Sequence, residues 1–260
     1  MEVIIKPDAD AVSKEAADLF ERTLRRKPGS VLGLATGSTP LGLYNELAQR
    51  CHEGRVSFVD VTTFNLDEYV GLAPDHPMSY RAYMHEHLFA RINILPDHTH
   101  VPDGRAGDIA RHCAEYEEAI RATGGIDLQL LGIGTDGHIG FNEPSSSLSS
   151  RTRLKTLTPR TIADNARFFG SEDKVPRHVI TMGVGTIMEA RQIVVLATGA
   201  AKAHAVAATV EGPIMADVPA SILQMHRSCT LVIDESAAGQ IKRGDYYRWV
   251  FDHKPDWQRA

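Results

Sequence analysis

A mostly apolar segment that opens abruptly into a glycine-rich loop limits what this chain can fold into. Residues 126–133 (IDLQLLGI) have the length and composition of a buried strand, and a loop with several glycines follows. Glycine tolerates positive φ and has no Cβ, so such a loop lets backbone approach a ligand closely. The loop carries Asp136, His138 and Glu143, three side chains able to move protons. We predict an active site here, because chemistry concentrates in loops on rigid scaffolds; a turn whose polar groups only satisfy backbone is the alternative.

Strand-like and helix-like patterns alternate along the rest of the chain. Asp8 or Asp10 is the expected cap of a first helix, and Thr39 is the expected N-cap of a helix that places Pro40 in its first turn. Further strands are expected at 31–35, 59–64, 179–182, 193–197 and 230–233, further helices at 79–91, 108–122 and 200–210, and a polar stretch at 145–155. The alternation predicts an α/β, Rossmann-like fold: a mainly parallel sheet with helices on both faces, three layers (αβα), in one domain spanning residues 1–260.

Composition excludes several classes of protein. The 260 residues include 28 basic and 33 acidic side chains, a net charge of −5 without the basic footprint that nucleic acid requires. Cys51, Cys113 and Cys229 are odd in number and far apart, which argues against a disulfide framework and against a zinc site. No signal-peptide pattern and no apolar run of the roughly 18 residues that a membrane span needs are present. We expect a cytoplasmic protein without membrane or nucleic-acid partners.

A second loop has the composition of a phosphate cradle. Thr36, Gly37, Ser38 and Thr39 lie between an expected strand and the N-terminus of a helix, where unpaired N–H groups favour an anion. The loop matches neither a P-loop nor a dinucleotide-binding fingerprint, so ATP and NAD have no support. An ordinary helix cap is the alternative. Because ligands bind at the carboxyl ends of parallel strands, loops 35–40, 65–72 and 134–144 are expected to converge on one crevice.

Carboxylates and one histidine supply the acid–base chemistry. Asp67 and Glu68 directly follow an expected strand, and neighbours in an extended chain face opposite ways, so one should enter the crevice while the other caps or pairs structurally. Asp136 and His138 are two apart, a spacing that lets the carboxylate fix the imidazole tautomer, and Glu143 could complete that relay. No serine or cysteine nucleophile motif accompanies them, which argues against covalent hydrolysis.

These loops together resemble the glucosamine-6-phosphate deaminase family. The matching segments are 34–40 (LATGSTP), 63–71 (TFNLDEYVG), 132–144 (GIGTDGHIGFNEP), 150–156 (SRTRLKT) and 165–169 (NARFF), in order through most of the chain. The resemblance implies conversion of glucosamine 6-phosphate and water into fructose 6-phosphate and ammonia, with no metal and no cofactor. It implies His138 as the ring-opening group tuned by Asp136 and Glu143, and Asp67 as the base that moves a proton from C2 to C1.

The resemblance also assigns binding residues. The substrate phosphate should meet residues 36–39 together with Arg167 and Lys202, and Arg167 belongs to a lid expected around 158–181. Some bacterial members are hexamers activated by N-acetylglucosamine 6-phosphate, so a homo-oligomer is expected, and the positions that match the activator site are Ser146, Arg153, Lys155 and Thr156. The preference for glucosamine over galactosamine 6-phosphate stays open.

Two rival functions share parts of this pattern. A 6-phosphogluconolactonase has a similar Gly-x-Asp-Gly-His loop, but residues 141–144 (FNEP) and 65–68 (NLDE) fit the deaminase pattern better. A non-enzymatic sugar-phosphate sensor would have lost acid–base groups, whereas Asp67, Asp136, His138 and Glu143 are all present. We therefore expect an enzyme.

Overall fold

A seven-stranded, wholly parallel sheet forms the centre of the molecule in a computed structural model, which describes residues 1–255 and 258. Its strand order is β1-β10-β9-β6-β2-β3-β5. The strands are β1 (Glu2–Lys6), β2 (Val31–Leu34), β3 (Thr62–Asn65), β5 (Thr99–His100), β6 (Leu128–Gly132), β9 (Gln192–Ala197) and β10 (Cys229–Asp234). The predicted α/β architecture is confirmed, and β1, which the sequence patterns did not reveal, completes one edge.

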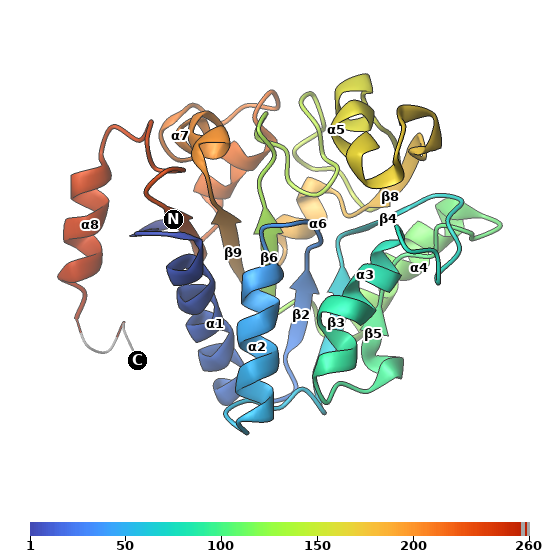
Figure 1. Ribbon diagram of the computed structural model, residues 1–260, viewed down its shortest axis with the longest axis horizontal. Helices are drawn as coiled ribbons and strands as arrows, with labels where there is room; N and C mark the ends of the chain where they lie inside the picture. Colours follow the sequence, from blue (N-terminus) through green and yellow to red (C-terminus); the bar gives the residue numbers. More distant parts are fainter. Residues whose placement is uncertain (256–257, 259–260) are drawn as a thin grey trace.

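Helices cover both faces of this sheet. Helices α1 and α2 pack together in front of the sheet as Figure 1 is drawn, while α4 and α6 lie behind it. On the far face, Phe64 of β3 meets Tyr116 of α4 edge to face, with ring centroids 5.6 Å apart. The α-helices are α1 (Ala9–Arg26), α2 (Leu41–His52), α3 (Tyr80–His87), α4 (Ile109–Ala122), α5 (Pro159–Phe169), α6 (Val184–Met188), α7 (Ala203–Glu211) and α8 (Gly244–Asp252). Five short 3₁₀ helices are η1 (Phe89–Arg91), η2 (Pro96–His98), η3 (Glu172–Lys174), η4 (Ala200–Lys202) and η5 (Pro219–Met225) among the described residues.

Local sequence explains where these elements begin and how they pack. Asp8, Ser79 and Asp108 each accept a hydrogen bond from a first-turn N–H of α1, α3 and α4, as side-chain caps do. Strand β2 is buried along its whole length, as expected of a central parallel strand. A Cβ on Gly33 would lie 2.0 Å from Oε1 of Gln129, so only glycine leaves room for that buried amide.

A second, antiparallel sheet with the order β4-β8-β7 lies beside the main one. Its strands are β4 (Asp67–Tyr69), β8 (His178–Thr181) and β7 (Arg153–Thr156), and β4 pairs with β8 from Asp67 opposite Thr181 to Tyr69 opposite Val179. A separate apolar cluster that includes Tyr69, Phe141 and Val179 packs against it. Strand β7 begins within the polar stretch expected at 145–155, where no strand was predicted.

Other boundaries also differ from the sequence-based expectations. Among the described residues, no side chain caps α2: Pro40, not Thr39, holds the N-cap position, so Thr39 was wrongly assigned as the cap. The strand expected at 59–64 begins only at Thr62, and the helix expected at 79–91 ends at His87 and continues as η1. In the part of the chain that the structure describes, no helix has both the length and the apolar character to cross a membrane. Cys51, Cys113 and Cys229 are free thiols.

The order of the parallel strands places the candidate loops together. Strands β9, β6, β2 and β3 are consecutive neighbours, so the loops at their carboxyl ends emerge at one edge of the sheet. These loops contain residues 35–40, 65–72, 134–144 and 199–202. Figure 1 shows α5 at this same end, beyond the arrowheads of β2, β6 and β9. The first three loops thus emerge at one edge, as predicted, and their enclosing a common crevice stays a prediction.

Candidate active site

The loop between β2 and α2 is open and uncapped, as an anion site requires. Gly37 has a φ of 109°, which favours glycine, and both Gly37 and Ser38 are exposed. Since no described side chain caps α2, the N–H groups of its first turn stay available to a ligand. Tyr83 of α3 donates its hydroxyl to the carbonyl of Gly37 at 2.5 Å, which ties the loop to the neighbouring helix.

Asp67 is a buried carboxyl at the start of β4, with a side chain that faces the loop after β6. Only 5% of the residue is exposed, and its Oδ2 lies 3.5 Å from the position that a Cβ on Gly140 would take. Burial, and to a smaller extent the neighbouring Glu68 carboxylate, raises the pKa of Asp67 to about 8. A carboxylate with such a high proton affinity has the property of a general base.

Glu68 points to the other side of β4, as the alternation of an extended chain predicts. Its carboxylate accepts hydrogen bonds from backbone N–H groups at the start of α3, including that of Tyr80 at 2.9 Å. The expectation that Asp67 and Glu68 divide between the crevice and a structural role is therefore consistent with the geometry.

Asp136 and His138 form a hydrogen-bonded pair in the glycine-rich loop. Oδ1 of Asp136 lies 2.7 Å from Nδ1 of His138 and accepts the backbone N–H of His138 at 3.2 Å. The hydrogen bond from His138 outweighs burial and lowers the pKa of Asp136 to about 2. With Nδ1 held by the carboxylate, Nε2 is the nitrogen left to exchange a proton. Gly134 makes room for the imidazole, because a Cβ there would lie 2.2 Å from Nδ1.

Glu143 is buried and turned toward α5. Its Oε1 accepts hydrogen bonds from the backbone N–H of Thr158 at 3.2 Å, from the Thr158 hydroxyl at 2.8 Å and from the Thr161 hydroxyl. These contacts attach the loop after β6 to the first turn of α5. The structure thus places Glu143 in the same loop as His138, but its hydrogen bonds run to the helix that covers the site.

The two cations expected to bind phosphate come from two different helical segments, α5 and the start of α7. Lys202 is half-buried at the start of α7, and Arg167 lies in the last turn of α5 with its guanidinium 4.7 Å from the Phe168 ring centroid. Burial lowers the pKa of Lys202, while the negative charges of Asp136 and Asp164 act in the opposite direction. The positive charge of Arg167 also acts to lower the pKa of Lys202, which indicates that the two cations lie near each other.

The four positions matched to an activator site surround β7. Arg153 and Lys155 are half-buried on one face of this edge strand, whereas Thr156 is exposed on the other face. Arg153 donates to Oδ1 of Asn142 at 2.9 Å, so it is connected to the loop that contains Glu143. Ser146 is buried, and its Oγ has no hydrogen-bond partner among the described residues.

Several site contacts were not predicted from the sequence. Thr158 and Thr161 hold Glu143, and Arg160 donates to the hydroxyl of Thr135 at 3.2 Å, next to Asp136. A threonine followed by proline is a common start of a helix, so Thr158-Pro159 was a signal for α5 that could have been used. The Tyr80 hydroxyl, hydrogen-bonded to the Thr36 side chain, had no such signal.

Comparisons with known proteins agree with this geometry. The family model described as glucosamine-6-phosphate isomerases/6-phosphogluconolactonase matches residues 7–232. The glucosamine-6-phosphate deaminase of Arthrobacter sp. (strain FB24) is 55% identical over 258 residues, which cover 99% of each chain. That of Hahella chejuensis (strain KCTC 2396) is 57% identical over 250 residues, covering 96% of this chain and 95% of the relative.

Solved structures separate the close relatives from the distant ones. A structure described as a monomeric glucosamine-6-phosphate deaminase has a TM-score of 0.90 at 43% identity, covering 92% of this chain and 100% of that one. A 6-phosphogluconolactonase from Trypanosoma brucei has a TM-score of 0.71 at 21% identity, covering 92% and 97%, which shows a shared fold alone. The chain belongs to the glucosamine-6-phosphate deaminase family.

Proposed function

We propose that this enzyme converts glucosamine 6-phosphate and water into fructose 6-phosphate and ammonia. The observation that carries the proposal is the position of a buried carboxyl of high pKa, Asp67, at the same sheet edge as the Asp136–His138 pair and an uncapped helix N-terminus. The first two supply acid–base groups, and the third suits a phosphate. We place the reaction in the cytoplasm, where free thiols such as those of this chain persist.

Ring opening is assigned to His138. Its Nε2 exchanges a proton with the ring oxygen or the C1 hydroxyl while Asp136 holds Nδ1–H and stabilises the imidazolium. Glu143 contributes by fixing the loop against α5, through its bonds to Thr158 and Thr161. The product of this step is the open-chain amino aldehyde.

Isomerisation is assigned to Asp67. Its carboxylate takes the proton from C2 of the open chain, which leaves an enolamine with a double bond between C1 and C2. Return of the proton to C1 produces a ketose imine at C2; water then adds to C2 and ammonia leaves. A base that is out of water and has a pKa near 8 is suited to removing this weakly acidic proton.

Substrate binding is assigned to residues 36–39 with Arg167 and Lys202. The lid that we infer is α5 with η3, residues 159–174, rather than the whole of 158–181, because β8 is buried and paired with β4. Closing this lid would bring Arg167 to the phosphate and exclude water from the enolamine.

The test is ammonia release from purified enzyme. Glucosamine 6-phosphate and galactosamine 6-phosphate are compared as substrates, with EDTA present in a parallel series and Asp67→Asn as the inactive variant. Release from glucosamine 6-phosphate, unaffected by EDTA and lost in the variant, supports the proposal, whereas release from galactosamine 6-phosphate alone would contradict it. Absence of ammonia together with hydrolysis of 6-phosphogluconolactone would contradict it.

Regulation is a separate proposal. We infer that the enzyme forms a homo-oligomer, up to a hexamer, in which Ser146, Arg153, Lys155 and Thr156 bind N-acetylglucosamine 6-phosphate. Three observations support this: the buried Oγ of Ser146 has no hydrogen-bond partner among residues 1–255 and 258, two cations lie on an edge strand, and Arg153 is hydrogen-bonded to Asn142. Light scattering and substrate-saturation curves test it: a monomer, like the solved relative, with curves that the activator leaves unchanged would contradict it.

A further inference from the structure

Glu68 makes an unusual set of contacts for a carboxylate next to the proposed base. Oε1 accepts the backbone N–H groups of Tyr69 at 2.8 Å and Tyr80 at 2.9 Å, and Oε2 accepts that of Arg81 at 3.1 Å. Only 3% of the residue is exposed. All three partners are donors, so the side chain acts as an ionised acceptor that joins β4 to the N-terminus of α3.

The first residue of α3 connects this junction to the phosphate loop. The Tyr80 ring lies 5.0 Å from that of Tyr69 and is stacked 6.2 Å from that of Phe141, measured between centroids. Its hydroxyl is 3.5 Å from the Tyr69 hydroxyl and is hydrogen-bonded to the Thr36 side chain. Glu68 therefore joins β4 to the first turn of α3, and Tyr80 connects this junction to the loop that contains Thr36.

We propose that Glu68 is a positioning residue for the deaminase reaction: by clamping α3 to β4, it fixes Asp67 relative to the phosphate loop, and its charge tunes that base. This inference rests on the proposed function of Asp67. Glu68 itself does not face the crevice, because adjacent residues of β4 point to opposite sides.

The charges around the two carboxylates are few. Tyr69 on β4, Tyr80 on α3 and Tyr116 on α4 face Asp67, and all three hydroxyls have raised pKa values because they are buried. Among these neighbours, the negative charge that raises the pKa of Asp67 is that of Glu68. Burial raises the pKa of Glu68, while its three N–H donors and the Arg81 guanidinium act in the opposite direction.

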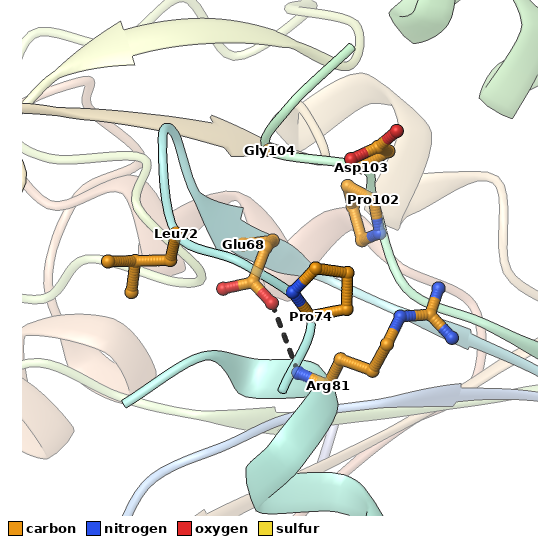
Figure 2. A pocket seen from close by; sticks show the side chains of 7 residues that line it. All are labelled: Glu68, Leu72, Pro74, Arg81, Pro102, Asp103 and Gly104. Carbon is orange, nitrogen blue, oxygen red and sulfur yellow. Dashed lines mark hydrogen bonds between the residues drawn. The ribbon is translucent and has the colours of Figure 1, made fainter. Parts of the chain in front are cut away.

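The side of Glu68 away from Asp67 borders a solvent-open cavity of about 380 Å³, shown in Figure 2. Leu72, Pro74 and Pro102 form apolar walls, and Arg81 and Asp103 contribute charge. Asp103 lines the same cavity but is exposed, and its Oδ1 accepts the N–H of Arg105 rather than an N–H of α3. Asp103→Asn is therefore a charge-matched control for changes at Glu68.

Glu68→Gln and Glu68→Asp test the proposal by steady-state ammonia release between pH 5 and 10. Glutamine cannot accept at both ends, so we expect kcat to fall 10- to 100-fold with KM changed less than threefold. Removing the charge lowers the pKa of Asp67, so the acid limb of the kcat/KM profile moves to lower pH. Glu68→Asp keeps the negative charge, so the acid limb of its kcat/KM profile stays at the wild-type pH. Its kcat lies between those of Glu68→Gln and wild type. Asp103→Asn should match wild type in kcat and in the position of the acid limb.

The outcomes separate this inference from the proposed function. If wild type releases no ammonia, the proposed function fails. If wild type is active and folded Glu68→Gln keeps its kcat or its acid limb, the positioning role is overturned. Should Glu68→Gln not fold by circular dichroism, Glu68→Asp decides alone: a lower kcat with an unmoved acid limb supports the role, while wild-type kcat or a shifted limb refutes it.

Discussion

Replacing Asp67 with asparagine is expected to abolish activity and yet stabilise the fold, by an amount that grows with pH. The carboxyl is 5% exposed, and burial, followed by the Glu68 charge, raises its pKa from an ordinary 3.8 to about 8. Between these two values the folded chain holds a proton that the unfolded chain has released. Folding is then penalised increasingly as pH rises, which is the opposite of the usual effect of a salt-bridged carboxylate.

The magnitude follows from the size of this pKa shift. Between pH values of about 4 and 8, each pH unit lowers the free energy of unfolding of the wild type by about 1.4 kcal/mol. The total loss is therefore about 5–6 kcal/mol once pH exceeds 8. Asparagine has nearly the same shape and no charge to desolvate. The advantage of Asp67→Asn in free energy of unfolding should therefore be small at pH 4, increase steadily to pH 8 and then level off.

Urea unfolding of the two proteins at pH 5, 6, 7 and 8 measures this difference. Asp103→Asn, which removes an exposed carboxylate, is the control and should show no such trend. A stability difference that is independent of pH, or a variant less stable than wild type at pH 8, would refute the inference that burial raises the pKa of Asp67.

Three further perturbations have defined outcomes. Asp136→Asn replaces the carboxylate that stabilises the charged imidazole with a neutral amide and should lower kcat 10²- to 10⁴-fold in the ammonia assay. Because the pKa of Asp136 is depressed to about 2, its carboxylate stabilises the fold above about pH 4, and this contribution is lost as pH falls from about 4 to 2. Since the pair is partly exposed, the loss of stability that the variant shows in urea unfolding at pH 7 should be small. Gly33→Ala forces a Cβ onto the buried amide of Gln129 and should cost about 1–3 kcal/mol in urea unfolding, most of it recovered in the double variant with Gln129→Ala; a fully stable single variant would contradict the packing. Thr161→Val removes a hydroxyl donor to Glu143 and should accelerate proteolysis within residues 159–174, and an unchanged cleavage rate would argue against this attachment of α5.

Sequence patterns predicted the inner strands β2, β6, β9 and β10 well, because they are buried and read as apolar runs, whereas the edge strands β1 and β5, which are only partly buried, were not predicted. In the antiparallel sheet β8 was expected as a strand, but β4 and β7 were not, since β4 has three residues and β7 alternates between half-buried and exposed positions. Its register, with Arg153 opposite Thr181, depends on contacts between distant segments that no local pattern encodes.

The same distinction between local and distant contacts applies to the site. Asp136 with His138, and the opposite orientations of Asp67 and Glu68, follow from spacing within a few residues, and both were expected. The partners of Glu143 lie 15 and 18 residues further on, in a helix that was not predicted. Side-chain contacts between separate elements therefore required the structure.

The pairing of β1 with β10 has a consequence for how the chain acquires its fold. Residues 2–6 are in register with residues 230–234, so this edge cannot form until more than two hundred intervening residues have been synthesised. Closing so long a loop is slow, and domains are made from the amino end onward. During synthesis, residues 2–6 therefore have no β10 to pair with, and their backbone hydrogen-bonding groups stay available to a chaperone that binds the nascent chain.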